Sequence, residues 1–278
     1  MIGGEGTRLI FVVSEIIETH SGVYAQARNT VRVEKPSTRV SRTSIAKTVQ
    51  KSYKEEKMSE ISLKDKPITA VKDPISTITH FIGFLAAILL SLILVAKSAY
   101  KGELISTIAI IIYSLSLIIL YGASSAYHFF NLSAKANKRL KKFDHIAIFY
   151  LIAGSYTPIC INTISPNERS LILIIIWTSA LAGTIMKLFW VCCPKYVSSI
   201  VYIAMGWTAL LRIRSFYLGL STGGFALLLA GGIFYTIGGI IYALKIRFNE
   251  NWGEHELFHI FVLLGSLFHY LMIFFYVA

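Results

Sequence analysis

The chain has 278 residues, of which 55% are apolar and only 15% are charged, against about 25% charged residues in an average soluble domain. This composition excludes a disordered chain and argues against an ordinary soluble enzyme. The net charge of +12 could suggest a nucleic-acid partner. In so apolar a chain, basic loops that mark one face of a membrane explain it more simply, and we expect no nucleic-acid partner.

Charged residues gather in the first 74 positions, which hold 13 of the 27 Lys and Arg residues and 9 of the 15 Asp and Glu residues. We expect residues 1–74 to form a polar, disordered tail and residues 75–278 to form one membrane domain. The sequence Lys-Glu-Glu-Lys directly precedes Met58, and its codons contain only purines, as in a translated ribosome-binding site. A further hypothesis is therefore that synthesis starts at Met58 and that residues 1–57 extend the natural chain.

Seven apolar segments follow the tail, and each is close to the 17–25 residues that a membrane-spanning helix needs. The fifth is the shortest. The sequence predicts spans over residues 75–96, 104–130, 146–164, 171–193, 196–211, within 215–244, and from about 254 to 277. The predicted fold class is therefore an all-α integral membrane protein, a bundle of seven transmembrane helices.

The basic residues between the spans predict the orientation of the bundle, because cytoplasmic loops are enriched in Lys and Arg. With a cytoplasmic N-terminus and an outer C-terminus, nine basic residues lie inside and five outside. The inner set is Lys135, Lys138, Arg139, Lys141, Lys142, Lys187, Lys195, Lys245 and Arg247, and the outer set is Lys97, Lys101, Arg169, Arg212 and Arg214. We therefore expect a multi-pass protein integral to the cell membrane.

Two other patterns concern small residues in the spans. Gly224, Gly231 and Gly238 are spaced by seven, so they lie near one face of the sixth span and predict close helix packing. Cys192 and Cys193 are interpreted as packing residues or a lipidation site rather than as metal ligands.

Ionisable side chains inside the spans are costly, and each is therefore a candidate for function. His255 and His259 lie four positions apart at the start of the seventh span, and this spacing places both imidazoles on one helix face. Ser124 and His128 have the same spacing near the end of the second span, and Asp144 opens the third. The end of the second span and the starts of the third and seventh spans lie on the same side of the membrane in either orientation. The five side chains can therefore converge.

The five side chains are of the kinds found at catalytic zinc sites. Three neutral imidazoles, from His128, His255 and His259, leave a fourth coordination position for water, as in catalytic zinc sites. Asp144 could then act as a general base, and Ser124 could orient the water or a reacting carbonyl. Copper, iron and nickel also accept nitrogen ligands. Each residue taken alone has an ordinary explanation as a hydrogen-bonded histidine, a packing serine or a carboxylate that caps a span.

Three further histidines are assigned other roles. His269 follows His255 by 14 residues and lies about 21 Å deeper, so we expect it to form an interhelical hydrogen bond. His80, on the first span, could support a metal ligand, although a structural polar contact is the simpler interpretation. His145 is expected to point away from Asp144.

At these positions the chain resembles the hemolysin III family, the bacterial branch of the progestin and adipoQ receptor family, which is related more distantly to alkaline ceramidases. The resemblance covers about residues 75–278. It rests on Ser-Ser-Ala-Tyr-His at 124–128, Phe-Asp-His-Ile at 143–146, Ile-Ala-Gly-Ser-Tyr-Thr-Pro at 152–158, Ala-Met-Gly-Trp at 204–207, His-Glu-Leu-Phe-His at 255–259, and His269.

The resemblance implies seven transmembrane helices, an intracellular N-terminus and a zinc ion bound by His128, His255 and His259. In the receptor branch, the residues that match Asp144 and Ser124 approach the zinc through water. The wider superfamily includes enzymes that hydrolyse ceramide amide bonds. Neither a pore-forming toxin nor a hormone receptor is implied for this chain.

Whether the chain is an enzyme stays open at this point. The leading hypothesis is a zinc-dependent hydrolase that acts on amide or ester bonds of membrane lipids, its expected partners. The alternative is a non-catalytic, zinc-stabilised protein of membrane-lipid homeostasis or cytolysis. Transport is a weaker third hypothesis, because broken helices and repeated halves are not evident.

Overall fold

The computed structural model describes residue 50, residues 71–249 and residues 252–278. The predicted start at Met58 and nearly all of the predicted tail lie outside these residues. Within them, seven helical segments are long and apolar enough to cross a membrane. These are α3 (Pro74–Tyr100), α4 (Leu104–Phe129), α5 (Ala134–Thr163), α6 (Pro166–Phe189), a composite span of α7 (Lys195–Gly206), a 3-10 segment (Trp207–Arg212) and α8 (Ile213–Gly219), α9 (Thr222–Leu244), and α10 (Glu254–Tyr276). The predicted seven-helix membrane bundle is confirmed.

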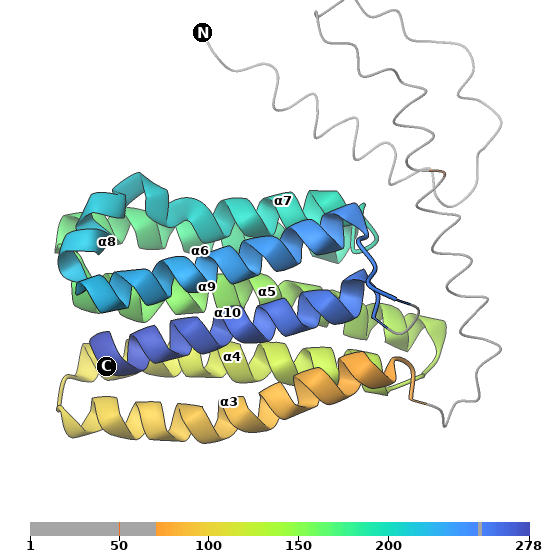
Figure 1. Ribbon diagram of the computed structural model, residues 1–278, viewed down its shortest axis with the longest axis horizontal. Coiled ribbons are helices and arrows are strands. Elements are labelled where there is room, and N and C mark those ends of the chain that lie inside the picture. The colour runs from red at the N-terminus through yellow and green to blue at the C-terminus, as the bar shows by residue number, and fades with distance from the viewer. Residues whose placement is uncertain (1–49, 51–70, 250–251) are drawn as a thin grey trace, which may run out of the picture. The chain divides into compact units, whose positions relative to one another are not determined.

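The spans run side by side (Figure 1), and α10 packs against both α9 and α3. The outer faces expose apolar side chains, as at Ile78, Ile82 and Leu85 on α3, which suits contact with lipid. α5 is the most deeply buried span and contacts α4, α6, α7 and α10. The ends of α4 and α6 and the starts of α3, α5, α7 and α10 therefore meet at one end of the bundle.

The third span begins earlier than expected. The apolar run predicted a start at residue 146, whereas α5 starts at Ala134, where the Ser133 side chain accepts a hydrogen bond from the Ala136 backbone N–H. The basic residues from Lys135 to Lys142 consequently lie on the first turns of a helix rather than in a loop. Charged turns that extend beyond the apolar stretch gave no hydropathy signal.

The fifth span is longer than the predicted residues 196–211. Its helix changes to a 3-10 segment at Trp207 and then continues to Gly219. The Tyr156 hydroxyl supports this break, because it donates to the Gly206 carbonyl at 2.6 Å and accepts from the Ala209 N–H at 2.8 Å. Backbone groups freed within a bilayer need such partners, which explains how an irregular segment is tolerated here.

The end of the fourth span also differs from expectation. α6 ends at Phe189, so Cys192 and Cys193 lie beyond the helix. Lys187 interrupts the predicted span 171–193 and was also counted as a loop charge for the orientation. It lies within the helix, and its side chain is fully buried. Without it, eight basic residues remain inside against five outside, and the predicted orientation is unchanged.

The glycines of α9 pack as predicted. A Cβ atom on Gly231 would lie 2.2 Å from His269 Cδ2, and one on Gly238 would lie 2.8 Å from Phe261 Cβ. Gly224 faces Tyr276 in the same way. The stripe therefore lets α9 approach α10 closely along its length.

Candidate metal centre

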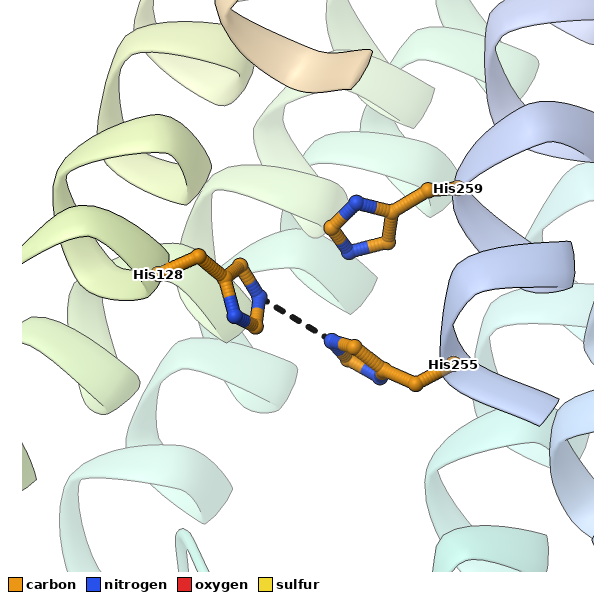
Figure 2. A group of neighbouring side chains, drawn as sticks. All are labelled: His128, His255 and His259. Atoms are coloured by element: carbon orange, nitrogen blue, oxygen red, sulfur yellow. Dashed lines mark hydrogen bonds between the residues drawn. The ribbon is translucent and has the colours of Figure 1, made fainter. Parts of the chain in front are cut away.

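Three histidines meet at the bundle end where α4 ends and α10 begins. His128 comes from α4, and His255 and His259 come from successive turns of α10 (Figure 2). Each offers one ring nitrogen, and the three nitrogens all lie within 4.8 Å of one another. The ring centroids are 4.6 to 4.9 Å apart. The structure thus brings together all three of the histidines that were predicted to converge.

The geometry of this group fits a metal ion. Bonds of about 2.0–2.1 Å to a tetrahedral zinc place ligand nitrogens about 3.3 Å apart. The Nε2 atoms of His128 and His255 are 3.0 Å apart, and His128 and His259 are almost fully buried. Three converging imidazoles at a buried position could therefore hold one metal ion, with further coordination left to water or substrate.

Asp73 fixes the orientation of His128. The His128 Nδ1–H donates to Asp73 Oδ2 at 2.9 Å, which leaves the Nε2 lone pair directed toward the other two histidines. The backbone N–H of Asp73 also donates to the His128 carbonyl at 3.0 Å, so the segment before α3 is paired to the end of α4. A carboxylate behind a metal-binding imidazole is the usual supporting partner of such sites. Asp73 was not among the residues predicted from the sequence.

Lys72 packs beside this carboxylate. Its ammonium donates to the Tyr127 carbonyl at 2.8 Å, lies 3.2 Å from the centre of the Tyr127 ring, and is 3.6 Å from Asp73 Oδ2. Burial lowers the pKa of Lys72 to about 8, although Asp73 acts in the opposite direction. Lys72 and Asp73 together fasten the start of α3 against the last turn of α4.

His80 lies directly behind one of the three histidines. Its ring stacks on that of His259 with centroids 3.6 Å apart, and the Tyr121 ring meets it edge-on at 5.1 Å. Among the described residues, neither ring nitrogen of His80 has a hydrogen-bond partner. This stacking contact agrees with the alternative that His80 supports a candidate metal ligand, whereas the simpler interpretation, a structural polar contact, is not borne out.

Asp144 and Ser124 line one cavity together with His255 and His259. Both side chains are buried. The expectation for His145 was wrong, because its Nδ1–H donates to Asp144 Oδ2 at 3.2 Å instead of pointing away. His145 itself is held in place through its backbone, where the Tyr202 hydroxyl donates to its carbonyl at 3.0 Å.

The cavity extends from the histidines toward the middle of the bundle. Its volume is about 110 Å³, and its lining includes both His255 and His269, which are about 21 Å apart along α10. Most of the lining is apolar, as at Leu151 and Ile203. The Nε2–H of His269 donates to the Leu228 carbonyl of α9 at 3.3 Å, which confirms the predicted interhelical role.

Comparison with known proteins agrees with this architecture. A family model described as haemolysin-III related matches residues 68–270, a range that contains every residue of the histidine site. The chain is 37% identical over 209 residues to Hemolysin-3 from Bacillus cereus, covering 74% of this chain and 93% of the relative. It is 35% identical over 209 residues to a Hemolysin-3 homolog from Bacillus subtilis (strain 168), covering 74% and 95%. The chain belongs to the haemolysin-III related family of multi-pass membrane proteins.

Proposed function

We propose that this protein is a zinc-dependent hydrolase that cleaves amide or ester bonds of membrane lipids. The observation that carries the proposal is that two of the three clustered imidazoles, those of His255 and His259, also line a long and largely apolar cavity. An acyl chain would lie in the apolar part, with its carbonyl group at the polar end. Membrane lipids are the partners that this arrangement suits.

The donor set favours zinc among the metals that accept nitrogen ligands. His128, His255 and His259 would hold the ion, and the carboxylate of Asp73 would keep His128 in the correct tautomer. When bound, zinc would supply a Lewis acid for the carbonyl oxygen and would activate water near neutral pH.

The remaining polar groups of the cavity have separate roles in this proposal. Asp144 would accept a proton from the attacking water, and His145 would keep the Asp144 carboxylate in position through their 3.2 Å hydrogen bond. Ser124 would donate a hydrogen bond to the carbonyl oxygen of the substrate as negative charge develops there. With the N-terminus in the cytoplasm, these groups would act near the inner leaflet.

A second function is favoured by one observation. The residues of the histidine group and its support come from α4, α10 and the segment before α3, so a metal ion there would fasten these parts together. Such an ion could serve stability alone, in a protein of membrane-lipid homeostasis or cytolysis. In that case Asp144 would be dispensable for metal binding and would have no proton to accept.

Turnover by an Asp144→Asn variant separates the two functions. The purified protein in lipid nanodiscs would be supplied with zinc and with a long-chain ceramide. The hydrolase proposal predicts a loss of about 100-fold or more in turnover while the zinc content stays unchanged. Glu103→Gln is the matched control, because it also turns a carboxylate into an amide, at an exposed position at the opposite end of the bundle. Undiminished turnover in Asp144→Asn would reject the proposal.

A further inference from the structure

A second polar cluster, formed by α6, the turn after it and α7, reaches the cavity through Ser198. Lys187 of α6, Cys193 of the following turn and Ser198 of α7 form a compact triangle. The Lys187 Nζ donates to Ser198 Oγ at 2.6 Å and to Cys193 Sγ at 3.1 Å, and the sulfur lies 3.1 Å from Ser198 Oγ. The proposed hydrolase mechanism uses none of these three residues.

The surroundings of Lys187 are unusual for a structural lysine. Its side chain has no exposed surface, although a charged group inside a membrane normally pairs with an opposite charge. In the part of the chain that the structure describes, its contacts are a thiol, a hydroxyl and, at 6.0 Å, the Tyr202 ring, and no carboxylate lies within ion-pair distance. Lys187 is therefore placed to act on Ser198 rather than to neutralise an acid.

Ser198 connects this cluster to the cavity. It is one of the lining residues, together with its neighbour Ser199 and with Tyr202 one turn further on. A hydroxyl within 2.6–3.2 Å of a basic side chain, where a third group orients the base, is the arrangement of an activated nucleophile. Serine–lysine pairs perform this chemistry on unrelated folds. Cys193, in contact with both partners, is in the position of the orienting group.

We propose that Ser198 is a nucleophile, with Lys187 as its general base, and that it accepts acyl groups from lipid esters bound in the cavity. Ser198 Oγ bonds to the acyl carbon while the free amine of Lys187 takes the hydroxyl proton. The ester C–O bond then breaks, and the proton passes from Lys187 to the departing alkoxide. In the second half, water gives a proton to Lys187 and its oxygen bonds to the acyl carbon. The bond to Ser198 breaks, and the serine oxygen recovers the proton.

This chemistry does not depend on the histidine site, so the two can fail separately. The test uses the whole protein in detergent and a fluorophosphonate with a long alkyl chain, which reacts with activated serines by loss of fluoride. Intact-mass measurement and peptide mapping are expected to show one adduct, on Ser198. The adduct should be absent from Ser198→Ala and retained in Ser199→Ala, a matched control because both serines are buried and line the cavity. It should also persist in His255→Ala.

The base is tested by Lys187→Met, in which the labelling rate is expected to fall about 100-fold or more. Thermal unfolding and size-exclusion elution of this variant show whether it folds. If it does not, the pair Ser198→Ala and Ser199→Ala decides the matter. A wild-type protein without an adduct on Ser198 would overturn the proposal, and so would a folded Lys187→Met variant that labels at the wild-type rate.

Discussion

Helix α10 carries histidines in two regions that differ in the partners of their rings. At the deep end, His269 has one backbone acceptor, the Leu228 carbonyl, and its ring fits over Gly231. At the other end, His255 and His259 face other imidazoles. The Nδ1 atoms of His259 and His269 both lack a hydrogen-bond partner among the described residues, so the two regions differ in what the other face of each ring meets: a backbone carbonyl at His269 and further imidazoles at His255 and His259. Histidines that converge on one another leave nitrogen lone pairs available to a metal.

The comparison also shows what supports each region. The deep histidine is held by close approach of two helices at glycines, which is a packing device. The converging histidines are held by a carboxylate, Asp73, behind His128 and by the stacked ring of His80 behind His259. Support of individual ring orientations is what a metal site requires, because metal affinity depends on ligand geometry.

Removal of the metal is expected to have the largest effect. A ligand at 1,000 times its Kd stabilises the folded state by about 4 kcal/mol, so a membrane-permeable chelator should lower the unfolding temperature of zinc-loaded protein markedly. Thermal unfolding in detergent measures the shift. His269→Ala should show the same shift as wild type, whereas His255→Ala/His259→Ala should show none. An equal shift in that double variant would mean that the metal binds elsewhere.

Asp73→Asn is expected to have the second-largest effect, a loss of zinc affinity. Loss of the carboxylate behind His128 should weaken zinc affinity by about 10- to 100-fold, because the ring orientation and tautomer are no longer fixed. Competition with a fluorescent zinc chelator measures this affinity. Glu103→Gln is the matched control, since Glu103 precedes α4 as Asp73 precedes α3, but at the opposite end of the bundle. Equal zinc affinity in wild type and Asp73→Asn would show that the Asp73 carboxylate does not support the metal site.

Gly231→Ala perturbs the packing of α9 against α10 around His269. Its Cβ would lie 2.2 Å from the His269 ring and 3.1 Å from the Gly265 carbonyl oxygen, so the ring or the helix must shift, at a cost of about 2 kcal/mol. Gly232→Ala is the neighbouring control, because its Cβ would meet nothing within 4 Å. Chemical denaturation should distinguish the two variants, with unchanged zinc content in both. A loss of zinc in Gly231→Ala would show that the two regions are coupled.

Tyr121→Phe should have the smallest effect. The Tyr121 hydroxyl donates to Ser266 Oγ at 2.7 Å, and Tyr235 contacts the same oxygen at 2.8 Å, between the two histidine regions. Loss of one such hydrogen bond costs about 1 kcal/mol, which denaturation experiments can resolve. Zinc content should stay at the wild-type level. A lower zinc content would show that the Tyr121 hydroxyl contributes to metal binding.

Periodicity and hydropathy were sufficient to predict the spans and the three converging histidines. The spacing of His255 and His259 fixes a common helix face, and an even number of crossings between two segments places them on the same side of the membrane. Asp73 was not found, because its partner His128 is 55 positions away and no helical spacing links them. The one available signal was an acid directly before Pro74, at the same side of the membrane.

Lys187 shows a different limit of sequence reasoning. A lysine near the end of an apolar run is normally a loop charge, and the hydropathy pattern gives no indication of burial here. Its partners Cys193 and Ser198 come from the next turn and the next helix, so only the tertiary arrangement reveals the cluster. The early start of α5 was missed for a related reason, because charged helical turns that project beyond the bilayer carry no apolar pattern.

Elemental mass spectrometry of the purified protein shows whether the converging histidines form a metal site. Wild type, His269→Ala and His255→Ala/His259→Ala are compared, each purified gently without chelators. We expect about one zinc per chain in wild type and in His269→Ala, and none in the double variant. Wild-type protein without bound metal, or a double variant that keeps its zinc, would mean that these histidines do not form the site.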